Sequence, residues 1–231
     1  MKILIVGASG KTGQKVLEHL AKTKHVVTGL IRNLEQINSV KQFGAEVLLG
    51  DLEGDVNSLT KNFDAIIFVA GSRGKNVEGV DYQGLVNIVD AAVNAKVKRF
   101  LYIGSINTGK NPQRFIQELK EFYQKNNEIV PEGLLKATEN PSYHTYIEMK
   151  NLAEKHLIDS GLNYTILRAG LLTLDPGSDK VKVISGTSNT FGKISRDNVA
   201  HCFIEALENE NTYRKIYTIL DGDMKISRCF Y

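Results

Sequence analysis

The sequence has no tryptophan, only two cysteines and only four prolines among its 231 residues. Cys202 and Cys229 cannot form a disulfide framework, and neither lies at zinc-site spacing from a second cysteine or a histidine. A reducing cytoplasm is therefore the expected compartment. The few prolines and the lack of low-complexity segments leave no linker, which predicts a single domain over residues 1–231.

Long apolar runs and paired histidines are missing as well. The first apolar stretch, Ile3–Val6, runs directly into glycines and is too short for a signal-peptide core or a membrane span. The histidines form no HxxxH or HExxH pair, so we expect no metal site. The formal net charge is +3 with the two signs interspersed, which argues against a nucleic-acid partner. We expect a monomer or homodimer that binds a small molecule and no membrane.

Short apolar runs alternate with helix-like segments along the chain. Because the runs are continuously apolar, the strands are expected to be buried on both faces of a parallel sheet. This pattern predicts an α/β fold with a doubly wound parallel sheet of the Rossmann type. The expected strands are Lys2–Val6, Val26–Ile31, Glu46–Leu49, Ala65–Ala70, Arg99–Ile103, Tyr164–Leu167 and Lys215–Leu220.

Residues 107–145 interrupt this alternation and are too many for an ordinary loop between a strand and a helix. We interpret them as a helical insertion on the side of the domain where a substrate would bind. Pro112 can open a helix that runs to about Asn126, on which apolar residues recur at helical spacing. This helix is expected to cover the substrate side of the pocket and to act as a lid or a partner surface; the alternative is a packing unit without a gating role. Its apolar residues are Phe115, Ile116, Leu119, Phe122 and Tyr123.

A glycine loop follows the first expected strand, with the sequence GASGKTG over residues 7–13. Glycines at this GxxGxxG spacing let the backbone approach a pyrophosphate, and the next helix offers free N–H groups at its N-terminus. The alternative is a glycine turn that only connects two elements. We predict a dinucleotide site formed by Gly7, Ser9, Gly10, Lys11, Thr12 and Gly13.

The residue after the second expected strand is Arg32. An NAD-preferring site usually carries an acidic residue there to bind the ribose hydroxyls, whereas an arginine suits a 2′-phosphate. Lys11 adds a second positive charge in the glycine loop. We therefore predict NADP as the cofactor, with NADPH preferred over NADH; the alternative is a solvated arginine in a basic turn.

Further motifs are Gly50-Asp51-Leu52, Val69-Ala70-Gly71-Ser72, the stretch from Val80 to Ala92, Arg168-Ala169-Gly170 and the stretch from Ile194 to Ala200. Together with the glycine loop they resemble the short-chain dehydrogenase/reductase superfamily, and in particular its atypical NAD(P)H-binding, NmrA-like branch. The resemblance covers nearly the whole chain. It implies that Asp51 and Leu52 flank the adenine, that Ala70, Gly71 and Ser72 pass under the cofactor, and that Ala169 and Gly170 approach the nicotinamide.

The catalytic signature of that superfamily is a serine after the fifth strand and a Tyr-x-x-x-Lys pair on the next helix. This chain has Ser105, Tyr146 and Lys150 at these places. Such a Tyr-Lys spacing is common by chance, so its placement carries the information. We expect Tyr146 to open a helix on which Lys150 lies one turn further along the same face. The apolar residues expected to face the sheet are Met149, Leu152, Ala153 and Leu157.

Each of these three residues can have its own role in a reduction. The Tyr146 phenol can donate a proton to a carbonyl oxygen that accepts a hydride, and Ser105 can hydrogen-bond the same oxygen. A free tyrosine has a pKa of about 10, and a neighbouring Lys150 ammonium is expected to lower the pKa of Tyr146 while also holding the nicotinamide ribose. The alternative is an ordinary helix start with a solvated lysine.

The sequence thus favours an NADPH-dependent oxidoreductase that transfers hydride to a small carbonyl, quinone or similar acceptor. Two departures from the superfamily pattern are Asp81, where many members have asparagine, and the long insertion. The main alternative is an NADP-binding redox sensor of the NmrA-like type without turnover, although such a sensor does not need the Ser-Tyr-Lys set. A sugar-nucleotide epimerase or dehydratase is disfavoured by Arg32 and by the short stretch after the last expected strand.

Overall fold

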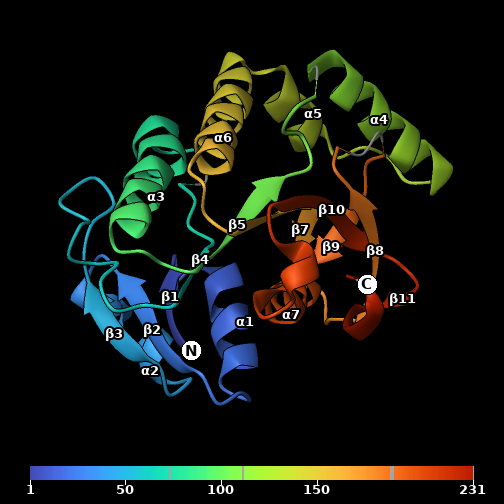
Figure 1. Ribbon diagram of the computed structural model, residues 1–231. Coiled ribbons are helices and arrows are strands. Elements are labelled where there is room, and N and C mark those ends of the chain that lie inside the picture. The colour runs from blue at the N-terminus through green and yellow to red at the C-terminus, as the bar shows by residue number, and fades with distance from the viewer. Residues whose placement is uncertain (73, 111, 188–189, 231) are drawn as a thin grey trace.

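The computed structural model describes residues 1–72, 74–110, 112–187 and 190–230, and its centre is a nine-stranded sheet (Figure 1). A separate small sheet pairs β7 (Leu171–Thr173) with β9 (Lys193–Ser195). The strands of the large sheet are β1 (Lys2–Val6), β2 (Val26–Ile31), β3 (Glu46–Leu49), β4 (Ala65–Phe68), β5 (Arg99–Ser105), β6 (Tyr164–Ala169), β8 (Lys180–Ser185), β10 (Lys215–Asp221) and β11 (Met224–Lys225).

The large sheet has the order β11-β8-β10-β6-β5-β4-β1-β2-β3. The strands from β3 to β10 run parallel, and β8 is antiparallel to β10 and β11. Because β1 lies between β2 and β4, the chain direction across the sheet reverses at the carboxyl ends of β1 and β4, where such folds bind ligands. The prediction of a doubly wound parallel sheet is confirmed.

Helices cover both faces of the sheet (Figure 1). The helices α1 (Lys11–Leu20), α2 (Ile37–Lys41) and α7 (Arg196–Leu207) bury their apolar residues against one face. The helices α3 (Gly84–Asn94) and α6 (Pro141–Asp159) cover the other face, and a π-helical segment, η2 (Val77–Gln83), leads into α3. No helix among the residues described is long and apolar enough to cross a membrane.

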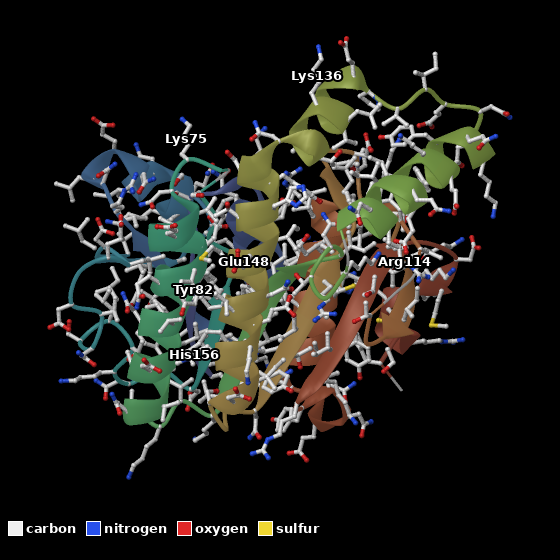
Figure 2. All side chains as sticks on the ribbon, turned by 90° about the horizontal axis from the view of Figure 1, so that it is seen from above. Lys75, Tyr82, Arg114, Lys136, Glu148 and His156 are labelled. Atoms are coloured by element: carbon white, nitrogen blue, oxygen red, sulfur yellow. The ribbon has the colours of Figure 1, made fainter. Side chains whose placement is uncertain are left out.

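Helix α6 differs from the expectation in two respects. It begins at Pro141, capped by the Asn140 side chain, so Tyr146 lies inside the helix rather than at its start. Ala153 and Leu157 are buried as expected, but the Leu152 side chain is 42% exposed. A His156–Asp90 hydrogen bond joins α6 to α3, and Figure 2 shows His156 and Glu148 along α6, near Tyr82 of η2.

The insertion folds into α4 (Pro112–Lys125) and α5 (Glu132–Glu139). The helix expected from Pro112 is present, and Phe115, Leu119 and Tyr123 are buried. They pack against Ile106, Phe191 and Leu220, so α4 covers the C-terminal strands, beside which Figure 2 places Arg114. A role as a lid therefore stays a prediction.

The packing of α4 can be tested with Leu119→Ala, because Leu119 is fully buried. A leucine truncated in a core costs about 2–4 kcal/mol of unfolding free energy. Ile129→Ala is the matched control, because Ile129 is 93% exposed. Urea unfolding of both variants measures the difference, and equal stability would show that α4 is not anchored to the strands below it.

Candidate functional site

A cavity of about 970 Å³ opens at the carboxyl ends of the central strands. Its wall contains most of the predicted cofactor residues, namely Gly7, Ser9, Gly10, Lys11, Thr12, Arg32, Asp51, Leu52, Ala70, Gly71, Ser72 and Lys150. Tyr146 and Gly104 line the same cavity. The fold therefore brings the predicted cofactor residues and the Tyr-Lys pair to one place.

The floor of the cavity is a close contact between two loops. Gly7 has φ +91°, and a Cβ atom added there would lie 2.5 Å from the backbone nitrogen of Ala70. Gly7 accepts a hydrogen bond from the Gly10 N–H at 3.0 Å, and Gly10 caps α1. Gly13 lies outside the wall of the cavity because it packs directly against Gly7 and Ala8, which lets α1 approach β1.

The cavity wall carries the cationic side chains of Arg32 and Lys11 and the acidic side chain of Asp51. Arg32 follows β2, and its backbone N–H donates to Gln36 Oε1 at 2.9 Å. This hydrogen bond stabilises the turn after β2. Gln36 also lines the cavity, a residue that the sequence reasoning missed. Within the described ranges, the exposed Arg32 side chain makes no hydrogen bond or ion pair. Arg32 and Lys11 thus offer cationic groups where a phosphate can bind.

The Ser72 loop is fixed by a buried carboxylate. The Ser72 backbone N–H and hydroxyl both donate to Asp81 Oδ2 of η2. Asp81 is itself buried and lines the cavity. The Asp81 side chain therefore orients the loop at Ser72.

Tyr146 and Lys150 line the cavity, whereas Ser105, the third predicted catalytic residue, lies outside its wall and beside Tyr146. Ser105 ends β5, and its hydroxyl shares a hydrogen bond with Tyr146 that lowers the pKa of the phenol. Burial and the nearby Asp81 carboxylate outweigh this effect and raise the pKa of Tyr146 to about 12. The sequence predicted a lowered pKa from Lys150. The Lys150 ammonium instead lies 3.5 Å from the Ile103 carbonyl oxygen and 4.6 Å from the centre of the Tyr102 ring.

Two predicted nicotinamide neighbours, Ala169 and Gly170, do not line the cavity. Ala169 pairs with Ser105 in the sheet, and Gly170 packs against the Gly192 backbone. Leu172, two residues further on, lies in the cavity wall instead. Ala169 and Gly170 therefore position Leu172 in the cavity wall but do not line the cavity themselves.

The sequence reasoning also missed Tyr143 and Arg196 as cavity residues. Tyr143 lies one turn before Tyr146, with their ring centres 6.3 Å apart, and its hydroxyl accepts a hydrogen bond from Asn107. Arg196 begins α7 and donates to the carbonyl oxygens of Leu172 and Thr173. The spacing of Tyr143 and Tyr146 on one helix was a signal that could have identified Tyr143.

A family model described as NAD(P)H-binding matches residues 7–210. The chain belongs to this NAD(P)H-binding family. The glycine loop and the cationic residues Lys11 and Arg32 line the cavity at the N-terminus of α1, which fits the nicotinamide dinucleotide that the family name implies.

Two relatives of similar sequence carry names that point to different roles. The chain is 31% identical to the uncharacterized sugar epimerase YhfK of Bacillus subtilis, over 98% of this chain and 97% of that protein. It is 23% identical to the photosystem II assembly factor Ycf39 of Synechocystis, over 95% of this chain and 62% of that protein. These names do not agree on one activity.

Solved structures share the fold over almost the full chain. A Bacillus halodurans protein named as an NAD-dependent epimerase/dehydratase superposes with a TM-score of 0.81 at 27% identity, covering 99% of this chain and 97% of that one. The anaerobilin reductase ChuY of Escherichia coli superposes with a TM-score of 0.76 at 23% identity, covering 97% and 99%. At that identity the second likeness shows the fold alone.

The close contact at Gly7 can be tested by comparing two glycines that both have positive φ. Gly7→Ala places a Cβ against Ala70, whereas Gly44, at φ +76°, has open space around it. We expect Gly44→Ala to cost about 1 kcal/mol of unfolding free energy through strain, and Gly7→Ala at least about 2 kcal/mol more. Urea unfolding measures both. Equal losses would mean that the two loops are not in close contact.

Proposed function

We propose that this protein is an NADPH-dependent oxidoreductase that transfers hydride to a small carbonyl, quinone or similar acceptor. The observation that carries the proposal is the presence of Tyr146 and Lys150, with Ser105 hydrogen-bonded to Tyr146, in the cavity that the glycine loop and Arg32 also line. The proposal extends to a cytoplasmic monomer or homodimer without a nucleic-acid or membrane partner.

In the proposed reaction the bound cofactor supplies the hydride. Tyr146 donates its phenolic proton to the oxygen of the acceptor, and the Ser105 hydroxyl hydrogen-bonds that oxygen. A pKa of about 12 keeps Tyr146 protonated throughout the neutral range, which is the form that a proton donor needs. Ionisation of the phenol would remove the donor only at strongly alkaline pH.

A second candidate is a regulatory or assembly protein that binds NADP without turnover. The name of the relative Ycf39, an assembly factor, favours it. A third candidate, a sugar epimerase, is favoured by the name of YhfK and opposed by Arg32, whose charge suits a 2′-phosphate. A screen of carbonyl and quinone acceptors that follows NADPH absorbance separates these candidates, because only the reductase consumes NADPH.

The role of Tyr146 is tested by Tyr146→Phe, which keeps the ring and deletes only the proton donor. We expect turnover to fall by about 10²- to 10⁴-fold with NADPH affinity nearly unchanged. Tyr213→Phe is the matched control, since Tyr213 stacks on Arg99 and is absent from the cavity wall. A Tyr146→Phe variant that reduces an acceptor at the parental rate would assign the proton to another group.

Cofactor preference is expected to follow Arg32, because its guanidinium can pair with a phosphate dianion and gains little from a neutral ribose. NADPH is expected to bind at least about tenfold more tightly than NADH, and Arg32→Asp to narrow or reverse that ratio. Arg228→Asp makes the same charge change outside the cavity wall and serves as control. Equal affinities of the parent protein for the two cofactors, measured by calorimetry, would contradict a role of Arg32 in NADPH preference.

A further inference from the structure

A buried group of charged side chains lies along the face of α6 that carries Tyr146. Tyr146, Lys150 and Glu154 are spaced at four-residue intervals, so they lie above one another on this face. Lys150 is 4% exposed and Glu154 is 1% exposed. Glu154 does not line the cavity, and the proposed reaction gives it no role.

Arg168 of β6 holds one oxygen of the Glu154 carboxylate. The Arg168 Nε and Nη2 groups both donate to Glu154 Oε2, at 2.9 Å and 2.7 Å. The third nitrogen, Nη1, donates to Thr187 Oγ1 at 2.7 Å. All three guanidinium nitrogens therefore have partners, and the carboxylate is fixed in one orientation.

The second oxygen, Oε1, lies over β5 beside Gly104. A Cβ atom added to Gly104 would lie 2.6 Å from Glu154 Oε1, so the glycine leaves the space that this oxygen occupies. Oε1 is buried and has no well-formed hydrogen bond within the described part of the chain, although the Thr108 hydroxyl lies close enough to the carboxylate to lower the pKa of Glu154. The Lys150 ammonium contacts the neighbouring residues of the same strand, Tyr102 and Ile103.

Burying an ammonium group is costly unless negative charge lies nearby. The charged and titratable groups around Lys150 are Asp81 of η2, Tyr102 of β5, Arg168 of β6, and Tyr146 and Glu154 on its own helix. Burial lowers the pKa of Lys150, and the Asp81 and Glu154 carboxylates oppose this effect. Asp81 has the larger effect of the two carboxylates and accepts two hydrogen bonds from Ser72. Glu154 has the smaller effect and accepts two hydrogen bonds from Arg168, but it lies on the same face of α6 as Lys150.

We propose that Glu154, held by Arg168, is a positioning residue that keeps the buried Lys150 in its charged form beneath Tyr146. The consequence for turnover rests on the proposed function, but the effect on Lys150 does not. A Glu154–Arg168 pair that only joined α6 to β6 would stabilise the fold without affecting the protonation of Lys150.

The direct test is an NMR titration of the Lys150 Nζ resonance in lysine-labelled protein, assigned by its loss in Lys150→Met. Glu154→Gln removes one negative charge with little change of shape. We expect the pKa of Lys150 to fall by about one unit or more in this variant. Glu154→Asp keeps the charge and is expected to retain most of the parental value.

Glu118→Gln is the matched control. Glu118 is also buried and accepts a hydrogen bond from a buried lysine, Lys110, at 2.6 Å, but this pair belongs to the insertion. We expect a comparable loss of stability from Glu118→Gln and no change in the Lys150 titration. An unchanged Lys150 pKa in Glu154→Gln would overturn the proposal.

Two further measurements keep the test decisive. If Glu154→Gln does not fold, Glu154→Gln/Arg168→Gln removes both charges together and is still expected to lower the pKa of Lys150, because the Glu154 carboxylate raises that pKa. If an acceptor is found, loss of turnover at alkaline pH should begin at lower pH in Glu154→Gln than in Glu118→Gln. A shifted Lys150 titration in a protein that reduces no acceptor would support this inference and contradict the proposed function.

Discussion

The close approach of two backbone loops, at Gly7 and Ala70, is the constraint on which the site depends. It brings the carboxyl ends of β1 and β4 together at the point where the sheet reverses its winding. A side chain at position 7 would separate the loops and lift the N-terminus of α1 away from the cavity floor. The fold therefore places backbone N–H groups, rather than side chains, where a pyrophosphate can approach.

Charge burial is the second organising feature of the site. Asp81 fixes the loop at Ser72 from one side, and Glu154 with Arg168 occupies the space over β5 on the other. Both carboxylates act on the pKa of Lys150, which lies on a helix that packs against the sheet. Such a cluster is costly to bury and is retained where a function requires a charged group in a fixed position.

The sequence predicted the parts of the molecule that depend on local pattern. Continuous apolar runs identified the parallel strands, and the glycine spacing identified the loop at residues 7–13. It did not predict that α6 begins at Pro141, because the Asn140 cap lies inside the insertion and was interpreted with it. It did not predict the raised pKa of Tyr146, because that follows from burial and from Asp81, which lies far away in the sequence. Tyr143 was missed although its spacing from Tyr146 on one helix offered a signal.

The central claim is that the cavity binds a nicotinamide dinucleotide through the glycine loop and the cationic side chain of Arg32. Calorimetric titration of NADPH into the parent protein tests it most directly, because binding needs no knowledge of the substrate. The account predicts saturable binding of one NADPH per chain that NADP⁺ displaces. No binding at millimolar NADPH, by a protein whose unfolding curve shows that it is folded, would contradict it.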